Sequence, residues 1–157
     1  MHWSILLFGY VLGGIARGVM IGGMLLAVTY YFAKFNLAHL PLIMLVLFLT
    51  SALFSLAGFL NGMFARTFDG IAVVPTFVLS PLTYLGGVFY TITMLPPFWR
   101  NIAAVNPIFY MVNALRHAML GQSEANFSLA LSIIGVTIII LIAINCILIK
   151  NNVGLRE

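Results

Sequence analysis

Charged residues are scarce in this sequence, and their scarcity excludes a water-soluble fold. Only 6% of the 157 residues are Asp, Glu, Lys or Arg, against roughly 25% in an average soluble domain. Seven basic and three acidic side chains cannot cover the surface of a soluble protein of this length. Hydrophobic residues make up 63% of the chain, so the composition predicts that hydrocarbon is its solvent.

Cysteine is almost absent as well, and so are the motifs of enzymes. The one cysteine, Cys146, lies in an apolar run, which excludes a disulfide framework and a Cys/His zinc site. The chain has no Gly-x-x-x-x-Gly-Lys-Ser/Thr loop, no His-Glu-x-x-His pair and no Gly-x-Ser-x-Gly elbow. We therefore expect no catalytic residue, no metal site and no cofactor site in this chain. The basic residues form no stripe, which argues against nucleic acid as a partner.

What the sequence does have is long uncharged stretches. A spanning helix needs about 20 predominantly apolar residues, because the hydrocarbon core is about 30 Å thick. Three long stretches contain no charged residue, and a fourth, at the N-terminus, contains one Arg. We expect an all-α integral membrane protein, one membrane domain over 1–157, with both termini on one side and four transmembrane helices at about 5–32, 40–65, 71–95 and 127–149.

The segment 96–121 is apolar but is not expected to cross the membrane. Its uncharged part is bounded by Arg100 and Arg116 and is too short for a span. Two proline-containing pairs mark helix boundaries in this segment: Pro96-Pro97 ends the preceding helix, and Asn106-Pro107 begins a short one. We expect external interfacial or re-entrant helices, marked by Pro96, Pro97, Trp99, Asn106, Pro107 and Arg116.

Two prolines fall inside the helix expected over 71–95. Pro75 and Pro81 each remove a backbone hydrogen bond and should kink or loosen that span. A bent helix suits a moving part, but proline is also common in static membrane helices. The sequence leaves both interpretations open.

Small residues recur on the first two expected spans and predict close helix packing. In a membrane, such stripes let two backbones approach where lipid gives no hydrophobic drive for association. The first span carries the stripe Gly14, Gly18 and Gly22, and the second carries Ser51, Ser55, Gly58 and Gly62. We interpret them as packing surfaces rather than ligand sites.

Polar residues within the expected spans are candidates for a pathway or for buried contacts. Arg17 lies inside the first span, and Asn61 lies near the end of the second. A charge at the centre of a helix costs roughly 2.5–3.5 kcal/mol on insertion scales, so Arg17 should face protein, water or headgroups. It is either a polar element of a substrate path or an arginine that snorkels to an interface.

The turn between the second and third spans contains Arg66, Thr67 and Asp69. Arg66 and Asp69 are three residues apart and can form an ion pair, which in solvent contributes only about 0–1 kcal/mol. The alternative is a turn that faces a partner protein. Composition does not choose between the two.

From Phe64 to Gly121 the sequence resembles the signature region of ABC-2 type transporter permeases. The resemblance rests on the order and spacing of several short words. These are Phe64-Ala65-Arg66-Thr67-Phe68-Asp69, Val74-Pro75-Thr76-Phe77, Ser80-Pro81-Leu82-Thr83-Tyr84-Leu85-Gly86-Gly87-Val88-Phe89-Tyr90, Leu95-Pro96-Pro97-Phe98-Trp99 and Asn106-Pro107-Ile108, followed by Leu115-Arg116 and Gly121. The run Gly13-Gly14-Ile15-Ala16-Arg17-Gly18 is similar to the third span of the bacterial branch.

The resemblance implies a bacterial inner-membrane permease with short external re-entrant helices. Such permeases act as homodimers with two ATPase subunits or domains and export lipids, saccharides or drug-like molecules by alternating access. The four expected helices would be the third to sixth spans, and the turn of Arg66, Thr67 and Asp69 would face the ATPase. ATP would be bound and hydrolysed by that partner and not by this chain.

The sequence departs from the family pattern at its start. The first two spans and the main coupling helix precede the position of Met1 in such permeases, so we expect a fragment, a truncated gene or a misassigned start. The alternative functions are a non-transporting structural or assembly protein and an inactive fragment. An ion channel and an intramembrane enzyme are disfavoured, because no filter-like loop and no nucleophile–base pair is present.

Overall fold

The fold is all-α, as the sequence predicts. The computed structural model describes residues 3–33, 39–65, 67–91, 94–121 and 125–151. No strand occurs in those ranges, and the elements are α1 (Trp3–Ala33), α2 (Leu40–Phe64), α3 (Phe68–Val73), the π-helix η2 (Val74–Leu79), α4 (Ser80–Leu85), α5 (Pro97–Val105), α6 (Pro107–Leu120) and α7 (Phe127–Lys150).

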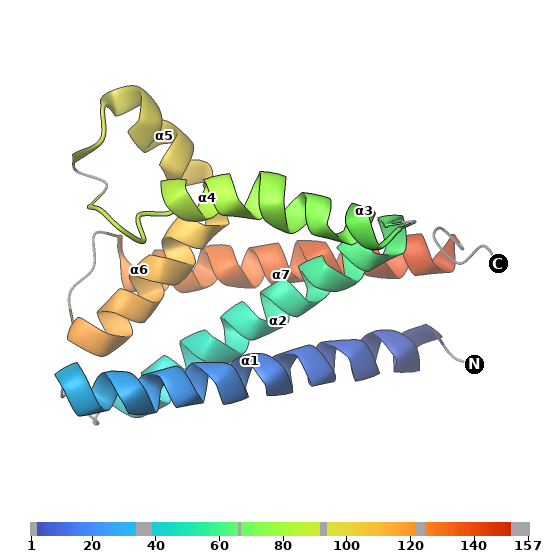
Figure 1. The fold of residues 1–157 in the computed structure, drawn as a ribbon, viewed down its shortest axis with the longest axis horizontal. Coiled ribbons are helices and arrows are strands. Elements are labelled where there is room, and N and C mark those ends of the chain that lie inside the picture. Colours follow the sequence, from blue (N-terminus) through green and yellow to red (C-terminus); the bar gives the residue numbers. More distant parts are fainter. Residues whose placement is uncertain (1–2, 34–38, 66, 92–93, 122–124, 152–157) are drawn as a thin grey trace.

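Three of the described helices are long and apolar enough to cross a membrane. They are Ile5–Phe32, Leu40–Phe64 and Phe127–Lys150. In Figure 1, α1 and α7 follow the long axis of the molecule, and α2 runs obliquely between its two ends. The beginning of α1 and the end of α7 lie at the same end of the molecule (Figure 1). Helix α2 is central, because it packs against α1, α6 and α7.

The helix expected over 71–95 has different bounds. Helical structure begins at Phe68, runs through α3, η2 and α4, and ends at Leu85, a length of about 27 Å at the α-helical rise. It ends there because Gly86 and Gly87 form a turn in which Gly87 adopts a positive φ of 74°, a conformation that favours glycine. In Figure 1 the segment begins beside the end of α2 and reaches the α5–α6 pair, but it is shorter than α1 and α7. It is a shorter apolar helix than the three that are long enough to cross a membrane.

The irregularity in this segment lies at its prolines. Pro75 is in the first turn of the π-helix, and Pro81 is in the first turn of α4. Each lacks an N–H, so the regular ladder of bonds is interrupted, and the chain closes wider i→i+5 turns instead. The hydroxyl of Ser80 donates to the carbonyl of Pro75 at 3.1 Å, five residues back. The expected loosening is therefore a π-helical stretch.

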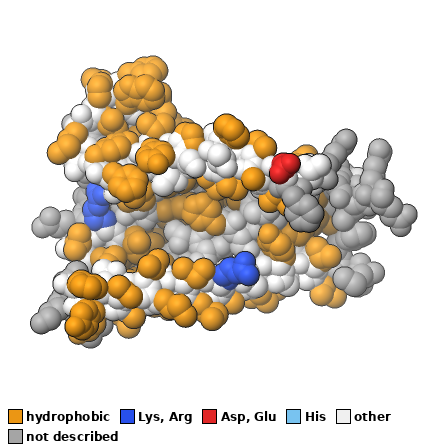
Figure 2. Space-filling view, in the orientation of Figure 1, with side chains coloured by type: hydrophobic (Ala, Val, Ile, Leu, Met, Phe, Trp, Pro, Cys, Tyr) orange, Lys and Arg blue, Asp and Glu red, His pale blue; other side chains and the backbone are white. Residues whose placement is uncertain are grey.

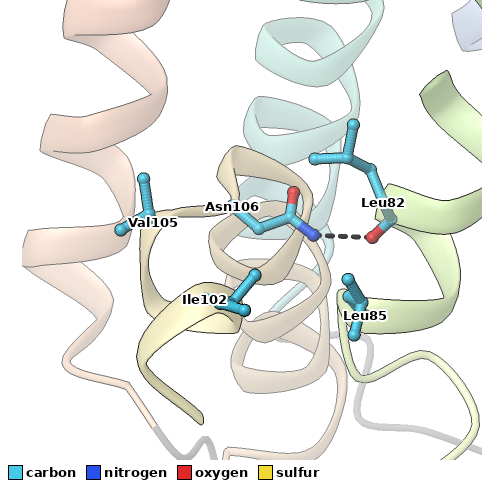
Figure 3. Close-up of a pocket in the computed structure, with 5 residues that line it drawn as sticks. All are labelled: Leu82, Leu85, Ile102, Val105 and Asn106. Atoms are coloured by element: carbon cyan, nitrogen blue, oxygen red, sulfur yellow. Dashed lines mark hydrogen bonds between the residues drawn. The ribbon is translucent and has the colours of Figure 1, made fainter. Parts of the chain in front are cut away.

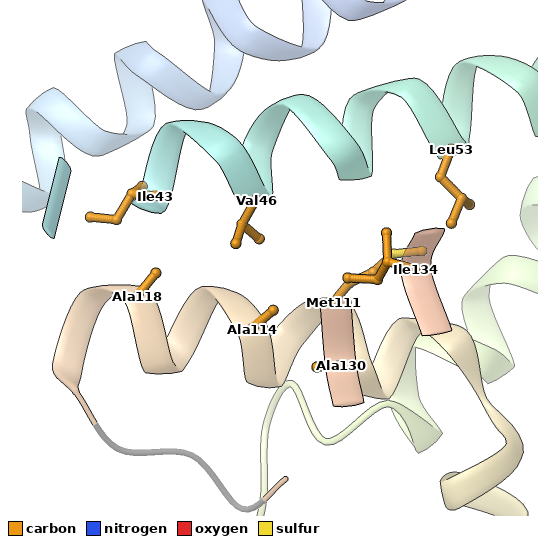
Figure 4. Packing of buried hydrophobic residues seen from close by; sticks show 8 residues of the cluster. All are labelled: Ile43, Val46, Leu53, Met111, Ala114, Ala118, Ala130 and Ile134. Carbon is orange, nitrogen blue, oxygen red and sulfur yellow. The ribbon is translucent and has the colours of Figure 1, made fainter. Parts of the chain in front are cut away.

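The main hydrophobic core lies between α2, α6 and α7. Figure 4 shows branched side chains of α2 meeting alanines of α6, with Ile134 and Ala130 of α7 beside them. Ala114, Ala118 and Ala130 are fully buried, which lets α6 approach both neighbours closely. The cluster contains Ile43, Val46, Leu53, Met111, Ala114, Ala118, Ala130 and Ile134.

Several hydroxyl side chains within the spans bond to their own helices. Thr29, Thr50 and Thr137 each donate to the carbonyl four residues earlier, at 2.8, 2.8 and 2.7 Å. Ser132 does the same at 2.8 Å. An unpaired hydroxyl in hydrocarbon costs several kcal/mol, so these bonds make polar residues compatible with long apolar helices.

We predict that enlarging the alanine at the centre of the core destabilises the protein. Ala114→Leu adds three heavy atoms where Ala114 has no exposed surface, and overpacking of this kind costs about 1–3 kcal/mol. Ala143→Leu on the exposed part of α7 is the matched control. Thermal unfolding in detergent should show a lower midpoint for Ala114→Leu only. Equal midpoints for the two variants would show that the core is not packed as described.

Candidate functional site

The glycine stripe of α1 packs against the serine stripe of α2. A Cβ built at Gly14 would lie 2.7 Å from Cβ of Ser55, and one built at Gly18 would lie 2.7 Å from Cβ of Ser51. One built at Gly22 would lie 3.0 Å from Leu47 Cδ2. At Gly14 and Gly18 these distances leave no room for a methyl group, whereas at Gly22 the end of the Leu47 side chain would have to shift slightly. The two backbones approach closely because one stripe has no side chains and the other has small ones.

The expected stripe on α2 ends earlier than the sequence suggests. A Cβ at Gly58 would be in ordinary contact with the hydroxyl of Tyr10, at 3.6 Å, and one at Gly62 would have no described atom within 4 Å. Gly62 therefore makes no close helix contact with the part of the chain that the structure describes. The two helices separate toward this end, since Gly58 already lies beyond the tightest contact.

Asn145 and Ser55 form hydrogen bonds between the spans, and of the two only Ser55 was identified from the sequence. Asn145 is fully buried in α7, and its amide donates to Leu56 O of α2 at 3.2 Å and to Leu141 O at 2.9 Å. Its Oδ1 has no hydrogen-bond partner among the described residues. The hydroxyl of Ser55 lies 3.4 Å from Tyr10 O of α1. The available signal was an asparagine inside an otherwise apolar run.

Arg17 lies on the surface of α1 beside a crevice between α1 and α2. The crevice has a volume of about 380 Å³ and is lined by Gly9, Tyr10, Gly13, Gly14, Arg17 and Ser55. Tyr10 packs edge-on against Phe59 of α2, with ring centroids 5.2 Å apart. In Figure 2, basic surface appears about half-way along α1, on the rim of a hollow between α1 and the α3–α4 segment. The guanidinium is exposed and is not packed among helices of this chain.

Asn61 is a link between two helices. Its amide donates to Ile71 O of α3 at 2.9 Å, so it fixes the turn that follows α2. Within the turn, Thr67 caps α3 by accepting from Gly70 N at 3.1 Å, and Asp69 is exposed in the first turn of α3. An acidic residue at this position complements the helix dipole. Arg66 lies outside the described residues, and so does its proposed pair with Asp69.

The segment expected to re-enter the membrane forms two short helices, α5 and α6. Pro96 precedes α5 and Pro97 occupies its first turn, while Asn106 caps α6 by accepting from Ile108 N at 3.0 Å and Pro107 begins it. Trp99 is 45% exposed on α5. Helix α6 ends at Gly121, whose φ is 71°.

Two hydrogen bonds fasten this helix pair to the end of α4. Asn106, which is only 4% exposed, donates from Nδ2 to Leu82 O at 2.6 Å. Arg116 donates from a terminal nitrogen to Gly87 O at 3.0 Å. A Cβ at Gly86 would lie 2.9 Å from Ile108 Cγ2, so glycine is needed for α6 to approach so closely. The α4–α5–α6 region is therefore one connected unit.

An apolar cavity of about 440 Å³ lies beside the first of these bonds. Figure 3 shows Leu82 and Leu85 on one side and Ile102 and Val105 on the other, with the amide of Asn106 turned toward the carbonyl of Leu82. A second apolar cavity, of about 260 Å³, lies between α2, α4 and α6. The polar lining residues, Asn106 in the first cavity and Thr50 and Thr83 in the second, hydrogen-bond to backbone carbonyls, which leaves little polarity for a ligand.

The comparisons with known proteins decide the family. The model of the ABC-2 type transporter family matches residues 1–120. The chain belongs to this family. The resemblance inferred from the residue motifs is thereby confirmed, and the match covers the glycine stripe, the turn after α2 and the whole of the α5–α6 pair.

Two curated relatives give the scale of the match. The inner membrane transport permease YadH of Escherichia coli strain K12 is 45% identical over 153 residues, which are 98% of this chain and 60% of that protein. Nodulation protein J of Rhizobium leguminosarum bv. viciae is 26% identical over 134 residues, or 85% of this chain and 49% of that protein. The chain thus spans between about half and 60% of the length of these relatives. No solved structure matches it.

For an ABC-2 family chain, the arrangement of polar contacts is informative. The described polar links lie at the two ends of the α3–α4 segment and between α1, α2 and α7. Between those ends, the last residues of α3 and nearly all of the π-helix, Ile71 to Val78, have exposed side chains. The segment is thus held at its ends and is free of close packing in its middle. Membrane helices without protein neighbours face lipid or another subunit.

We predict that Gly18→Val weakens the α1–α2 contact of this ABC-2 family protein. The added side chain must displace Ser51 or separate the helices, and the expected cost is about 1–3 kcal/mol. At Gly23 a Cβ would meet no described atom within 4 Å, so Gly23→Val is the control. Thermal unfolding in detergent should distinguish the two. A midpoint for Gly18→Val as high as that of the control would contradict the close approach.

We further predict that Asn106→Ala loosens both α4 and α6. The change removes a helix cap, worth about 1 kcal/mol, and also the bond to Leu82 O. Asn126→Ala is the matched control, because Asn126 caps α7 by accepting from Ser128 N at 3.2 Å and forms no side-chain bond to another described helix. Hydrogen exchange should rise at the start of α6 and the end of α4 only in Asn106→Ala. An increase in exchange at α6 alone would show that the bond from Asn106 to Leu82 O does not stabilise α4.

Proposed function

We propose that this chain forms part of the membrane permease of an ABC-type exporter, whose conformational cycle is driven by ATP hydrolysis in a separate subunit. Family membership supports a permease, and the sequence contains no nucleotide-binding loop of its own. The transport permease YadH is described as an inner membrane protein, and we propose the same bacterial membrane for this chain. The cargo class, whether lipid, saccharide or drug-like, stays open.

The observation that carries the proposal is the α3–η2–α4 segment. One end is tied to α2 through Asn61 and Ile71, and the other is tied to α5 and α6 through Asn106 and Arg116. Between the ties lies a π-helical stretch with two prolines, where fewer regular bonds oppose bending. A helix of this kind can transmit movement of the turn at Thr67 to the α5–α6 pair, as alternating access requires.

The proposed partners follow from the same geometry. The exposed turn of Thr67 and Asp69 would contact the ATPase, with Arg66 beside them in sequence. The exposed side chains of Ile71 to Val78 would be covered by the second permease of a homodimer or by lipid. The competing hypothesis is a non-transporting structural or assembly protein, or an inactive fragment, in which the turn would contact no ATPase.

We predict that an ABC ATPase co-purifies with the tagged chain and that its ATP hydrolysis rate changes on binding. Asp69→Lys reverses the charge of the turn and should reduce the recovered ATPase several-fold. Asn101→Lys, on exposed α5 at the other end of the molecule, should leave recovery unchanged. The measurement is the ratio of ATPase to chain after purification in detergent. A folded chain that binds no ABC ATPase would favour the structural alternative.

A further inference from the structure

The crevice beside Arg17 has features that no other described cavity shares. It is the one with a charged side chain in its lining, and this charge lies far from both ends of its helix. Arg17 is 12 residues beyond Ile5, where the apolar span begins, which is about 18 Å along the helix. A cation at this depth requires an interaction that replaces water.

The crevice is open because its α1 side is made of glycine. Gly9, Gly13 and Arg17 follow one another at intervals of four residues, so they lie on one face of α1. A Cβ at Gly9 or Gly13 would meet no described atom within 4 Å. The face beside the guanidinium is therefore bare backbone with free space above it, unlike the face of Gly14 and Gly18, which is filled by α2.

Among the residues that the structure describes, Arg17 has no counter-charge. No hydrogen bond or ion pair joins Arg17 to any residue that the structure describes. The three acidic residues of the sequence are Asp69, Glu124 and Glu157, and none of them lies in a candidate span. A second copy of the chain brings the same residues and so cannot supply a carboxylate at this depth. The described residues therefore leave the guanidinium of Arg17 open to an anion from outside them.

We propose that the crevice binds the acidic headgroup of an amphiphilic molecule, a phosphate or a carboxylate, whose apolar chain lies along α1. A guanidinium forms paired, charge-assisted hydrogen bonds with such groups. The same helix face continues into Ile5 and Ile21, which are 64% and 53% exposed, so apolar surface lies on both sides of the charge. The anion could belong to a membrane lipid or to an acidic cargo.

The test measures binding by the full chain without an ATPase, so its outcome does not depend on the proposed transport function. The chain, purified in detergent, is mixed with phosphatidylglycerol or with phosphatidylcholine of the same acyl chains, and bound lipid is counted by native mass spectrometry. We expect the chain to bind phosphatidylglycerol in preference to phosphatidylcholine. In Arg17→Gln the affinity for phosphatidylglycerol should fall roughly tenfold, as expected when one charge-assisted interaction is lost.

Matched variants test whether binding needs the crevice as well as the charge of Arg17. Gly13→Leu fills the crevice while keeping Arg17, and the open space at Gly13 allows the fold to remain intact, so binding should fall as in Arg17→Gln. Gly23→Leu adds the same group elsewhere on α1 and should bind as the unchanged chain does. Equal thermal midpoints would show that each variant is folded.

Extraction of amphiphiles that co-purify from cells distinguishes the two sources. A phospholipid retained by the chain and lost in Arg17→Gln assigns the site to membrane lipid, and another acidic amphiphile lost in the same way assigns it to cargo. The proposal is overturned if phosphatidylglycerol and phosphatidylcholine bind equally, or if neither Arg17→Gln nor Gly13→Leu reduces binding of an acidic amphiphile.

Discussion

The constraint on which the structure depends is that hydrocarbon cannot hydrogen-bond to a protein backbone. Long helices satisfy their own N–H and C=O groups, and four hydroxyl side chains of the spans bond to carbonyls one turn earlier, those of Thr29, Thr50, Ser132 and Thr137. The same constraint explains the buried amide of Asn145, which donates to two carbonyls. These polar side chains satisfy backbone carbonyls of their own or a neighbouring helix, whereas Arg17 has no hydrogen bond to a described residue.

Close packing in this molecule uses small residues in place of large apolar ones. Where lipid surrounds the helices, removing apolar surface from lipid gives little free energy, so contact area and proximity matter more. Gly14 and Gly18 therefore meet Ser55 and Ser51, and the buried alanines of α6 and α7 lie at the core. The result is one central helix, α2, with a different partner on each side.

The irregular helix connects the turn after α2 with the α5–α6 pair. Its regular parts, α3 and α4, are each tied to a neighbour by an asparagine, and its π-helical middle is not closely packed. Irregular backbone in a membrane is tolerated where other groups satisfy it, and the hydroxyl of Ser80 does this for Pro75 O. In an ABC-2 family chain, such a segment is suited to transmit motion between the turn at Asp69 and the α5–α6 pair.

The sequence by itself determined the solvent, the fold class and the family. Uncharged runs mark long helices because hydrocarbon penalises charge at every position, and proline pairs mark where α5 and α6 begin because proline lacks an N–H. The spacing of Gly14 and Gly18 identified a packing face, since residues four apart share one side of a helix. These signals are local, so they can be read without knowing the neighbours.

Only the tertiary structure decided which groups meet. The helix expected over 71–95 ends at Leu85 in the α3–η2–α4 segment. It ends there because the glycines of the following turn, Gly86 and Gly87, let α6 pack closely against it, although α6 begins about 20 residues later in the chain. The tertiary structure made Asn61 and Asn145 links between helices and left Arg17 beside an open crevice. Contacts between distant residues depend on how whole helices pack, and periodicity along one helix does not contain that information.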